Sequence, residues 1–429
     1  MKLAESSERW LGKVPAEWRR SRIRNVASLS PGYSASVPTA DEVCTVVPME
    51  LLSEDGNIDV SNRQLFEDVQ LGLTLFEEGD VLFAKITPCM ENGKGAVVRK
   101  LRTRYAFGST EFHVLRPSRI IDGQFLYYAT FNPVFRAYAA ENMSGAAGQK
   151  RVSSRFLKDT RLFLPPLREQ ECIAAYLDAS CAAVDAALEA KRRQLKTLDE
   201  LRKSTIQRAV TKGLNPAAQM RRTNVEWIPE MPHHWRLVRV KDALDFFNTV
   251  RVPLSAAERG VMTERIYDYY GASGVIDKVE NYLFDGTYIL LAEDGANLLT
   301  RSKPLAFLAT GKFWVNNHAH ILKPRYGDDS FFVNLLECQD YSLFVSGAAQ
   351  PKLTMENLGR YKLAVPPLAE QQAIAAFIRQ KDAEFSPLFA QIQRQIETLV
   401  AYRKSLIHEC VTGQRRVTEQ ELARVLRHD

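Results

Sequence analysis

Several features that would place a protein at a membrane or outside the cell are missing from this sequence of 429 residues. No apolar run approaches the ~18 residues that a membrane-spanning helix needs. The first ten residues hold Glu5 and Glu8 with two serines between them, where a signal peptide would have an apolar stretch. We therefore expect a cytoplasmic protein that is neither secreted nor inserted into a membrane.

Cysteine is scarce as well. The six cysteines are scattered along the chain, at Cys44, Cys89, Cys172, Cys181, Cys338 and Cys410. No two of them have the Cys-x-x-Cys spacing of a structural zinc site, and they are too few for a disulfide scaffold. We expect reduced and mostly buried thiols.

Catalytic motifs are also absent. The Gly-Lys pairs at residues 12–13, 93–94 and 311–312 lack the upstream glycine and the following Ser or Thr of a nucleotide-binding P-loop. Neither Ser-x-x-Lys nor Gly-x-Ser-x-Gly occurs, so covalent catalysis has no candidate nucleophile. Residues 132–135, Asn-Pro-Val-Phe, are similar to the Asn-Pro-Pro-aromatic motif of amino-methyltransferases, but the second proline and a glycine-rich S-adenosylmethionine loop are missing. We expect no catalytic residues in this chain.

Two histidines raise the question of a metal site. His318 and His320 would share one face of a strand, because alternate residues of a strand point the same way. No third ligand is apparent beside them. We therefore expect histidines that make hydrogen bonds in or beside a binding loop rather than a metal centre.

The net charge is small, since 57 Lys and Arg stand against 51 Asp and Glu, but its distribution along the chain is uneven. Residues 41–80 hold eleven acidic residues and one basic residue, a net charge of −10. Residues 81–164 hold fourteen basic and five acidic residues, a net charge of +9. We expect the first globular segment to be electrically polarised.

Basic side chains beside aromatic ones are typical of nucleic-acid contacts, because they neutralise phosphates and enter grooves. In the basic block such residues are followed directly by Tyr105 and Phe107, and a second set follows the glycine-rich residues 144–148. An ordinary solvated face would give the same pattern. The candidate DNA contacts of this half are Lys85, Lys94, Arg99, Lys100, Arg102, Arg104, Gln149, Lys150 and Arg151.

In the second half, basic residues are dispersed around two polar glycine-containing loops, residues 269–274 and 293–297. Such loops let a backbone approach a ligand closely, and Asn and Arg side chains can read adenine and guanine edges. Structural turns give the same pattern, so both interpretations stay open. The candidate DNA contacts here are Tyr270, Ser273, Asn297, Arg301, Lys303, Asn317, His318, His320, Gln350 and Lys352.

An internal repeat organises the chain. Residues 164–170, Leu-Pro-Pro-Leu-Arg-Glu-Gln, recur 201 positions later as Val-Pro-Pro-Leu-Ala-Glu-Gln at 365–371. Upstream, Trp10 and Trp18 recur as Trp227 and Trp235, at an offset of 217. The two globular segments between these motifs share almost no further sequence, which suggests two related tasks on two different targets.

A long helix is predicted after each Pro-Pro-Leu turn. Residues 169–211 contain neither Gly nor Pro, apolar residues recur there at steps of three and four, and Gly213 gives a stop signal. Helices of about 40 residues would be about 60 Å long, and the simplest partner for each apolar seam is the other helix. Two unrelated core helices are the alternative. The seams comprise Leu177, Val184, Leu188, Leu195 and Leu198 in the first copy and Ile378, Phe385, Phe389, Ile392, Ile396 and Leu399 in the second.

One proline breaks the symmetry of the two helices. Pro387 lies in the second helix where Ala186 stands in the first. Because proline lacks the N–H that an inner turn of a helix requires, we predict a kink or a restart near Phe385.

The globular segments are expected to be mixed and β-rich. Residues 73–86 indicate a strand, an acidic turn at 77–80 and a second strand. Residues 282–292 repeat this pattern around Asp285 and Gly286, a dipeptide typical of hairpin turns. The predicted fold class is α+β, with two β-rich domains separated by two long antiparallel coiled-coil helices in a pseudo-twofold internal repeat.

With these motifs in order, the sequence resembles the specificity subunit of type I restriction-modification systems. The similarity rests on residues 18–19, 78–88, 91–96, 108–112, 269–274 and 316–320 and on the Pro-Pro-Leu-x-Glu-Gln motif before each helix. The resemblance implies target-recognition domains at 1–164 and 214–364, spacer helices at 165–213 and 365–416, and a C-terminal tail at 417–429.

The resemblance also implies a function. The chain would be a non-catalytic subunit that reads a bipartite, asymmetric site in double-stranded DNA. It would hold no cofactor itself, and it would dock two methyltransferase subunits that use S-adenosylmethionine and a restriction and translocation subunit that uses ATP and Mg²⁺. One alternative is a stand-alone DNA methyltransferase or nuclease, which needs a cofactor or metal constellation. Another is a coiled-coil adaptor that binds only proteins, which leaves the +9 block unexplained.

Overall fold

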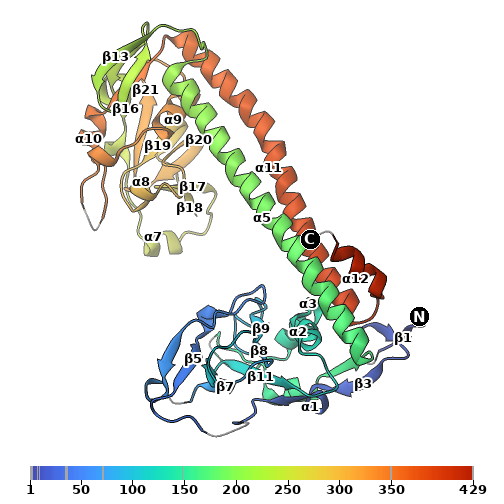
Figure 1. Cartoon of the computed structure of the whole chain (residues 1–429). Helices are drawn as coiled ribbons and strands as arrows, with labels where there is room; N and C mark the ends of the chain where they lie inside the picture. The colour runs from blue at the N-terminus through green and yellow to red at the C-terminus, as the bar shows by residue number, and fades with distance from the viewer. Residues whose placement is uncertain are drawn as a thin grey trace. The chain divides into compact units, whose positions relative to one another are not determined.

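The computed structural model describes residues 3–6, 8, 10–33, 37–69, 72–146, 148–347 and 350–427. The chain divides into two compact units (Figure 1). Unit 1 consists of Met1–Arg192 and Arg394–Asp429, and unit 2 is the continuous stretch Arg193–Gln393. Each unit therefore combines one globular segment with parts of both long helices.

The globular segment of unit 1 contains two four-stranded sheets, with strand orders β6-β5-β10-β7 and β4-β11-β8-β9. Neighbouring strands are antiparallel except β5 and β10, which run parallel. The strands span Ala27–Leu29 (β4), Val43–Val47 (β5), Arg63–Leu65 (β6), Thr74–Phe76 (β7), Val81–Ala84 (β8), Gly95–Val97 (β9), Ala106–Gly108 (β10) and Phe112–Pro117 (β11).

The alternation of side chains along β8 shows how the layers of unit 1 are joined. Val81 and Phe83 belong to the core formed with the helices, whereas Leu82 belongs to the core shared with the first sheet. The remaining elements of the unit are β1 (Leu3–Glu5), β2 (Lys13–Pro15), β3 (Arg19–Arg22), α1 (Ile23–Val26), α2 (Gly123–Phe131), α3 (Pro133–Glu141), α4 (Ser154–Asp159), β12 (Arg161–Leu164) and α12 (Glu419–Val425), with short 3₁₀ turns at Met49–Leu51 and Phe66–Asp68.

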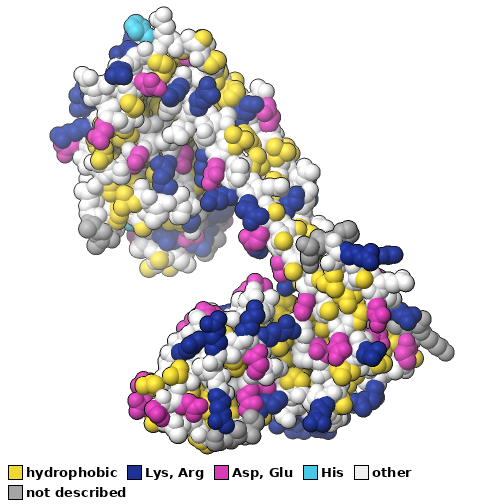
Figure 2. Space-filling view, viewed as in Figure 1, with side chains coloured by type: hydrophobic (Ala, Val, Ile, Leu, Met, Phe, Trp, Pro, Cys, Tyr) yellow, Lys and Arg dark blue, Asp and Glu magenta, His cyan; other side chains and the backbone are white. Residues whose placement is uncertain are grey.

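The acidic and basic blocks of the first segment are interleaved in the fold, so their separation in the sequence is not a separation into two parts of the structure. Strands β5, β6 and β7 come from the acidic residues 41–80 and share a sheet with β10 from the basic block. Arg116 of the basic block forms ion pairs with Glu77 and Asp80 of the acidic block. Side chains of both signs are accordingly interspersed on the face that Figure 2 shows.

Unit 2 is built on one six-stranded sheet with the order β16-β21-β19-β20-β17-β18, in which only β17 and β20 are parallel neighbours. Along β19, Ile289 and Leu291 pack in the core that includes α9, while Leu290 faces the opposite side. The sheet and its helix span Leu244–Phe246 (β16), Tyr267–Gly271 (β17), Gly274–Val279 (β18), Phe284–Ala292 (β19), Ala306–Val315 (β20), Ala319–Pro324 (β21) and Asp329–Glu337 (α9).

Shorter elements complete unit 2. The two-stranded pairs β13 with β14 and β15 with β22 correspond in chain order to β1 with β2 and β3 with β12 of unit 1. These elements span Met220–Val225 (β13), Ile228–Pro232 (β14), Arg236–Arg239 (β15), Val240–Ala243 (α6), Ala256–Gly260 (α7), Asn297–Thr300 (α8), Met355–Arg360 (α10) and Lys362–Val365 (β22), with 3₁₀ turns at Asn248–Val250 and Ser342–Phe344.

The hairpin turn predicted at Asp285 and Gly286 is wrong. Both residues lie inside β19, where they pair with Lys312 and Gly311 of β20. Gly286 has a φ of +129° and faces another glycine of positive φ across the ladder, so the dipeptide marks an irregular stretch of paired strands rather than a chain reversal. The corresponding residues 73–86 do form strand, turn and strand, but β7 and β8 belong to different sheets.

The two long helices are α5 (Leu167–Lys212) and α11 (Leu368–Val411). In unit 1 the first part of α5 packs against the last part of α11, and in unit 2 the first part of α11 packs against the last part of α5. The helices are therefore antiparallel. The predicted seam residues Leu177, Val184, Leu188, Ile378 and Phe385 are buried, and Leu195, Leu198, Phe389, Ile392, Ile396 and Leu399 are half-buried.

Of the kink or restart predicted near Phe385, the restart is wrong, because α11 is helical from Leu368 to Val411 with Pro387 inside it; the kink stays a prediction. Proline removes one hydrogen bond, to the carbonyl of residue 383. Both Ala383 and Pro387 are exposed, so water can satisfy that carbonyl while Phe385 remains buried in the core. The free energy lost with this one hydrogen bond does not outweigh the free energy gained by packing the helix.

The repeated Pro-Pro-Leu-x-Glu-Gln motif has the same structural role in each unit. The buried amide of Gln170 donates to the carbonyl of Pro165 and accepts from the N–H of Asp122, the N-cap of α2. Gln371 makes the same two bonds, to Pro366 and to Asp328, the N-cap of α9. The motif therefore fixes the start of each long helix to the globular segment of its unit.

Candidate nucleic-acid interface

The basic run from Lys94 to Arg104 does not form one patch. Lys94 is half-buried and donates to the carbonyl of Met49, 2.9 Å away. Arg99 donates to Gln124 of α2, which in turn donates to Asp178 of α5. The backbone N–H of Lys100 binds the carboxylate of Glu78, and Arg104 lies 5.3 Å over the ring of Tyr105.

Arg102 is exposed, and within the described part of the chain its side chain makes no hydrogen bond or ion pair. The run thus supplies several separate cations, most of them with a local partner. These basic side chains lie apart because the run connects β9 to β10, and these two strands belong to different sheets.

The structure brings a second predicted set together at the end of β8. The backbone of Lys85 accepts from the N–H of Val152 at 2.9 Å, and the N–H of Thr87 donates to the carbonyl of Lys150 at 3.0 Å. Arg151 lies beside this strand end, and its Nε and Nη2 donate hydrogen bonds of 2.8 to 3.1 Å to the carboxylate of Glu111. The guanidinium of Arg151 lowers the pKa of Glu111, which remains a carboxylate.

Unit 2 repeats this geometry with different residues. The backbone of Glu293 accepts from Leu353 at 2.8 Å, as Lys85 does from Val152, and the N–H of Gly295 donates to the carbonyl of Pro351 at 2.9 Å. Lys352 takes the place of Arg151, because it pairs with Ser346 as Arg151 pairs with Ser144. The ends of β8 and β19 are therefore equivalent positions in two units of different sequence.

A buried histidine supports the equivalent segment in each unit. Nε2 of His113 lies 2.9 Å from the carbonyl oxygen of Val152, and Nε2 of His320 lies 2.7 Å from that of Leu353. Burial lowers the pKa of both imidazoles, so both rings are neutral at pH 7 and Nε2 is the donor. His320 therefore supports the backbone from the core, fully buried, rather than meeting a ligand.

Glycines allow the tight loop before each basic residue. Gly145 has a φ of +141°, and a Cβ there would lie 2.4 Å from the carbonyl oxygen of Gln149. Gly347 has a φ of +89°, and a Cβ there would lie 2.6 Å from the oxygen of Gln350. The sequence carries a signal for this pair, because Ser-Gly-Ala-Ala occurs at 144–147 and again at 346–349. Of these residues Ala147, Ala348 and Ala349 lie outside the described residues.

The charges around the two strand ends differ. In unit 2 the buried carboxylate of Glu293 lies 2.6 Å from Arg251 and 3.4 Å from Lys352. Burial raises the pKa of Glu293, but the hydrogen bond and charge of Arg251 and the charge of Lys352 outweigh burial and lower this pKa overall, so the carboxylate stays ionised. His318 pairs instead with Asp294, at 2.9 Å from both carboxylate oxygens. Within the described residues no group of three or more His, Cys, Asp or Glu side chains could hold a metal ion.

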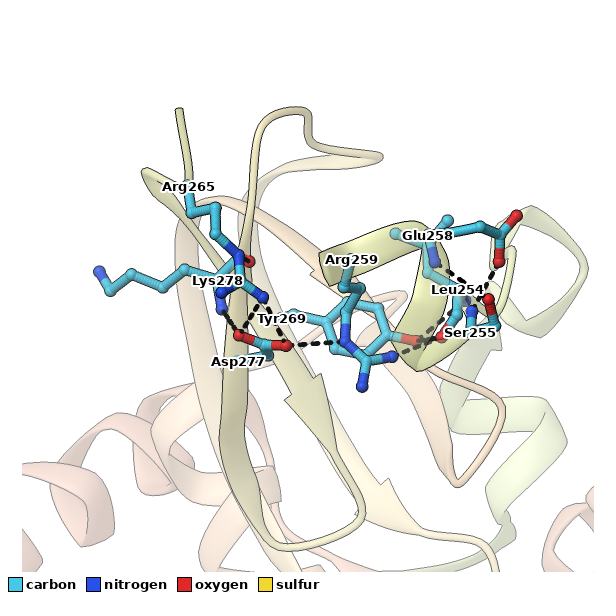
Figure 3. A network of polar contacts seen from close by, with 8 residues as sticks. All are labelled: Leu254, Ser255, Glu258, Arg259, Arg265, Tyr269, Asp277 and Lys278. Carbon is cyan, nitrogen blue, oxygen red and sulfur yellow. Dashed lines mark hydrogen bonds and ion pairs between the residues drawn. The ribbon is translucent and has the colours of Figure 1, made fainter. Parts of the chain in front are cut away.

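The hairpin of β17 and β18 carries Ser273 at its turn and is held by a polar network (Figure 3). Asp277 accepts from Arg259 of α7 at 2.8 Å and from Arg265 at 2.9 and 3.0 Å, and these bonds lower its pKa. Arg259 also lies 4.8 Å over the ring of the buried Tyr269. The network fixes the hairpin to α7, whose first turn is closed by a capping box of Ser255 and Glu258.

The other predicted residues of unit 2 are placed as follows. The ring of Tyr270 stacks on Phe307 at 5.8 Å and is half-buried. Asn297 binds the backbone of Lys303 and so closes the loop between α8 and β20. Arg301 donates to the carbonyls of Glu337 and Gln339 at the end of α9. Asn317, Lys303, Gln350 and Lys352 are exposed.

The arrangement as a whole can bind a polyanion. The exposed groups are amides and cations such as Gln149, Lys150 and Gln350, held on short loops by buried strands. The six cysteines are free, and burial raises the pKa of five of them, that of Cys181 to about 11 and that of Cys410 to about 12. Thiols of such high pKa are poor nucleophiles at neutral pH.

Comparison with known proteins agrees with this duplicated, ligand-binding plan. Residues 46–197 and 232–398 match the family model of the type I restriction modification DNA specificity domain. The chain belongs to this family. Among the described residues no helix is both long and apolar enough to cross a membrane.

Curated relatives carry corresponding names. The type I restriction enzyme EcoAI specificity subunit of Escherichia coli is 35% identical over 164 residues, which are 38% of this chain and 27% of that protein. The chain thus spans about a quarter of the length of this relative. The putative type I restriction enzyme MjaX specificity subunit of Methanocaldococcus jannaschii is 21% identical over 424 residues, 95% of this chain and 96% of that protein.

Solved structures share the fold. A chain from work on complex assembly and conformational transition of the type I R-M system matches with a TM-score of 0.72 at 18% identity, over 93% of this chain and 98% of that one. The HsdS subunit from Thermoanaerobacter tengcongensis matches with a TM-score of 0.51 at 18% identity, over 96% of this chain and all of that one.

Proposed function

We propose that this chain is the DNA-reading subunit of a type I restriction-modification enzyme. One observation carries the proposal: two units of one plan have different residues at equivalent strand ends, the half-buried Lys85 in unit 1 and the buried Glu293 in unit 2, and different exposed residues around them. Two readers of common architecture and different surface suit a bipartite, asymmetric DNA site. The antiparallel helices α5 and α11 would set the gap between the two half-sites.

The chain would work without catalysis of its own, alongside separate enzymes in the cytoplasm. Two methyltransferase subunits would supply S-adenosylmethionine chemistry on adenine, and a restriction and translocation subunit would supply ATP and Mg²⁺ chemistry. This division is supported by the family and by an interface of amides and cations. The target-recognition domains would be residues 1–164 and 214–364, and residues 417–429 would form the tail.

The test is a survey of adenine methylation across the genome with and without this gene. We expect one bipartite motif to disappear when the gene is deleted and to return with the full chain. Retention of every methylated motif in the deletion strain would contradict the proposal. The purified chain, incubated alone with labelled S-adenosylmethionine and DNA, should transfer no label.

The spacer role has a separate test. Inserting the same four residues into α5 after Leu195 and into α11 after Gln393 lengthens both helices by about one turn. We expect the two half-sites to stay the same while the number of bases between them changes. Altered half-sites would show that the helices do more than set a distance.

A further inference from the structure

Two short segments share a backbone geometry and a Gln-x-basic pattern in both units, although the surfaces around them differ. They are Gln149–Arg151 in unit 1 and Gln350–Lys352 in unit 2, here called the basic segments. Each begins with an exposed glutamine, ends in a basic residue and is separated by one residue from a hydroxyl N-cap, Ser153 of α4 or Thr354 of α10.

The backbone of each basic segment is fixed by matching contacts. Arg151 and Ser144 exchange two backbone hydrogen bonds of 2.8 and 3.1 Å, and Lys352 and Ser346 exchange two of 2.7 and 2.9 Å. The following residue of each segment is tied to a strand end and to a buried histidine. So many shared contacts hold each segment in a defined pose on its unit.

Both segments lie among charged side chains. In unit 1, Lys85, Lys150 and Arg151 stand against Glu111. In unit 2, Arg251 and Lys352 stand against Glu293 and Asp294, and Asp294 also pairs with His318. Among the described residues, the side chains of Gln149, Lys150 and Gln350 make no hydrogen bond or ion pair with the protein. Each segment therefore offers an exposed amide beside a basic side chain, and in unit 1 the positive charges outnumber the negative ones.

If the two units bind different half-sites, an element that has the same geometry in both units cannot distinguish one half-site from the other. Contacts to phosphates fix register and orientation without reading sequence, whereas contacts to base edges discriminate. We propose that the two basic segments are equivalent phosphate-binding elements that hold each half of the DNA in the same register. Base reading falls to parts that differ between the units, such as the β17–β18 hairpin. The inference rests on the proposed DNA-reading function.

The test uses the full chain and two duplexes, one with its methylated site and one of unrelated sequence. The variants are Lys150→Ala and the pair Gln149→Ala with Gln350→Ala, all at exposed positions. We expect affinity for both duplexes to fall by the same factor, about tenfold. For Lys150→Ala the dependence of log affinity on log salt should flatten by about one unit, as for one lost phosphate contact. The genomic methylation motif should remain unchanged.

Lys158→Ala is the matched control, because it removes an exposed lysine of α4 outside the segment. It should change affinity much less than Lys150→Ala does. A changed methylation motif, a loss confined to the cognate duplex, or an equal effect of Lys158→Ala would each overturn the phosphate role. If the unmodified chain does not prefer its methylated site at all, the DNA-reading function itself fails, and this outcome is distinct from the others.

Discussion

Arg116 holds the buried carboxylate of Asp80 with two parallel hydrogen bonds, from Nε to Oδ1 and from Nη2 to Oδ2, each 2.9 Å long. Asp80 is 1% exposed and also accepts from the N–H of Glu77, so it orders the turn between β7 and β8. This pair joins residues of the acidic and the basic block at the junction of the two four-stranded sheets of unit 1.

Asp80→Ala should therefore destabilise unit 1 by about 3 kcal/mol, because a mostly buried guanidinium loses its main partner. Urea unfolding followed by tryptophan fluorescence would measure the loss. The control is Asp242→Ala, which breaks the exposed Arg239–Asp242 pair of unit 2 and should leave the midpoint nearly unchanged. Equal effects of the two variants would contradict the role given to Asp80.

The glutamines of the repeated motif should have equal effects in the two units. Gln170→Ala and Gln371→Ala each leave a proline carbonyl and the N–H of a helix N-cap without their partner, at a cost of about 2 kcal/mol. Limited proteolysis with mapped cleavage sites would show which unit opens. Gln372→Ala, which removes the neighbouring exposed glutamine of α11, is the control. A variant that increases cleavage equally in both units would show that the two glutamines do not act separately, each in its own unit.

Stability should fall on mild acidification because of His113 and His320. Burial holds the folded-state pKa of both imidazoles below the unfolded value of about 6.5, so the unfolded chain takes up protons first as the pH falls. The loss begins near pH 6.5 and grows toward the folded-state pKa, and above pH 7 it is absent.

Urea midpoints at pH 7.5 and 5.5 would check this expectation. The double variant His113→Asn with His320→Asn should lose less stability between the two pH values than the unmodified chain loses. His233→Asn, at an exposed position, should behave like the unmodified chain. An unaltered pH dependence in the double variant would assign the effect to other groups.

Replacing the helix proline should stabilise α11. Pro387→Ala restores the missing N–H to an exposed position of a continuous helix, so we expect a gain of about 1 to 3 kcal/mol. The matched change in the other helix is Ala186→Pro, which should cost about 3 kcal/mol. Thermal unfolding by circular dichroism at 222 nm would measure both. A loss of stability in Pro387→Ala would show that the proline has a local role in packing.

The helical part of the fold could be predicted because its signals are periodic and local. The regular geometry of a helix is enough to predict the apolar seam that includes Leu177 and Ile378. It is also enough to predict the helix end at Gly213, which has a φ of +78°. The β-rich segments were harder, because strand pairing joins residues far apart in sequence. Asp285 and Gly286 have the composition of a turn, yet they pair with Lys312 and Gly311, and only the long-range register decides between the two outcomes.

Composition indicated the cations of the interface but not their partners. Arg301 satisfies carbonyls at the end of α9, and Arg151 grips Glu111, forty residues away in the chain. The charge blocks did not indicate separate parts of the structure for the same reason, since β10 of the basic block lies in one sheet with β5, β6 and β7 of the acidic block. The equivalence of Lys85 and Glu293 could not be seen from residue types, because it is an equivalence of backbone contacts between residues of opposite charge.

The division of the chain has a consequence for synthesis on the ribosome. Unit 2 is one continuous stretch, whereas unit 1 needs residues from both ends, since Leu406 and Cys410 pack in the same core as Trp10 and Phe125. Domains generally fold as their residues emerge, the N-terminal one first. Unit 2 can therefore complete its core before the end of α11, which the core of unit 1 requires, has been synthesised. A stop codon shortly before Arg394 would therefore damage the globular segment made first and spare the one made second.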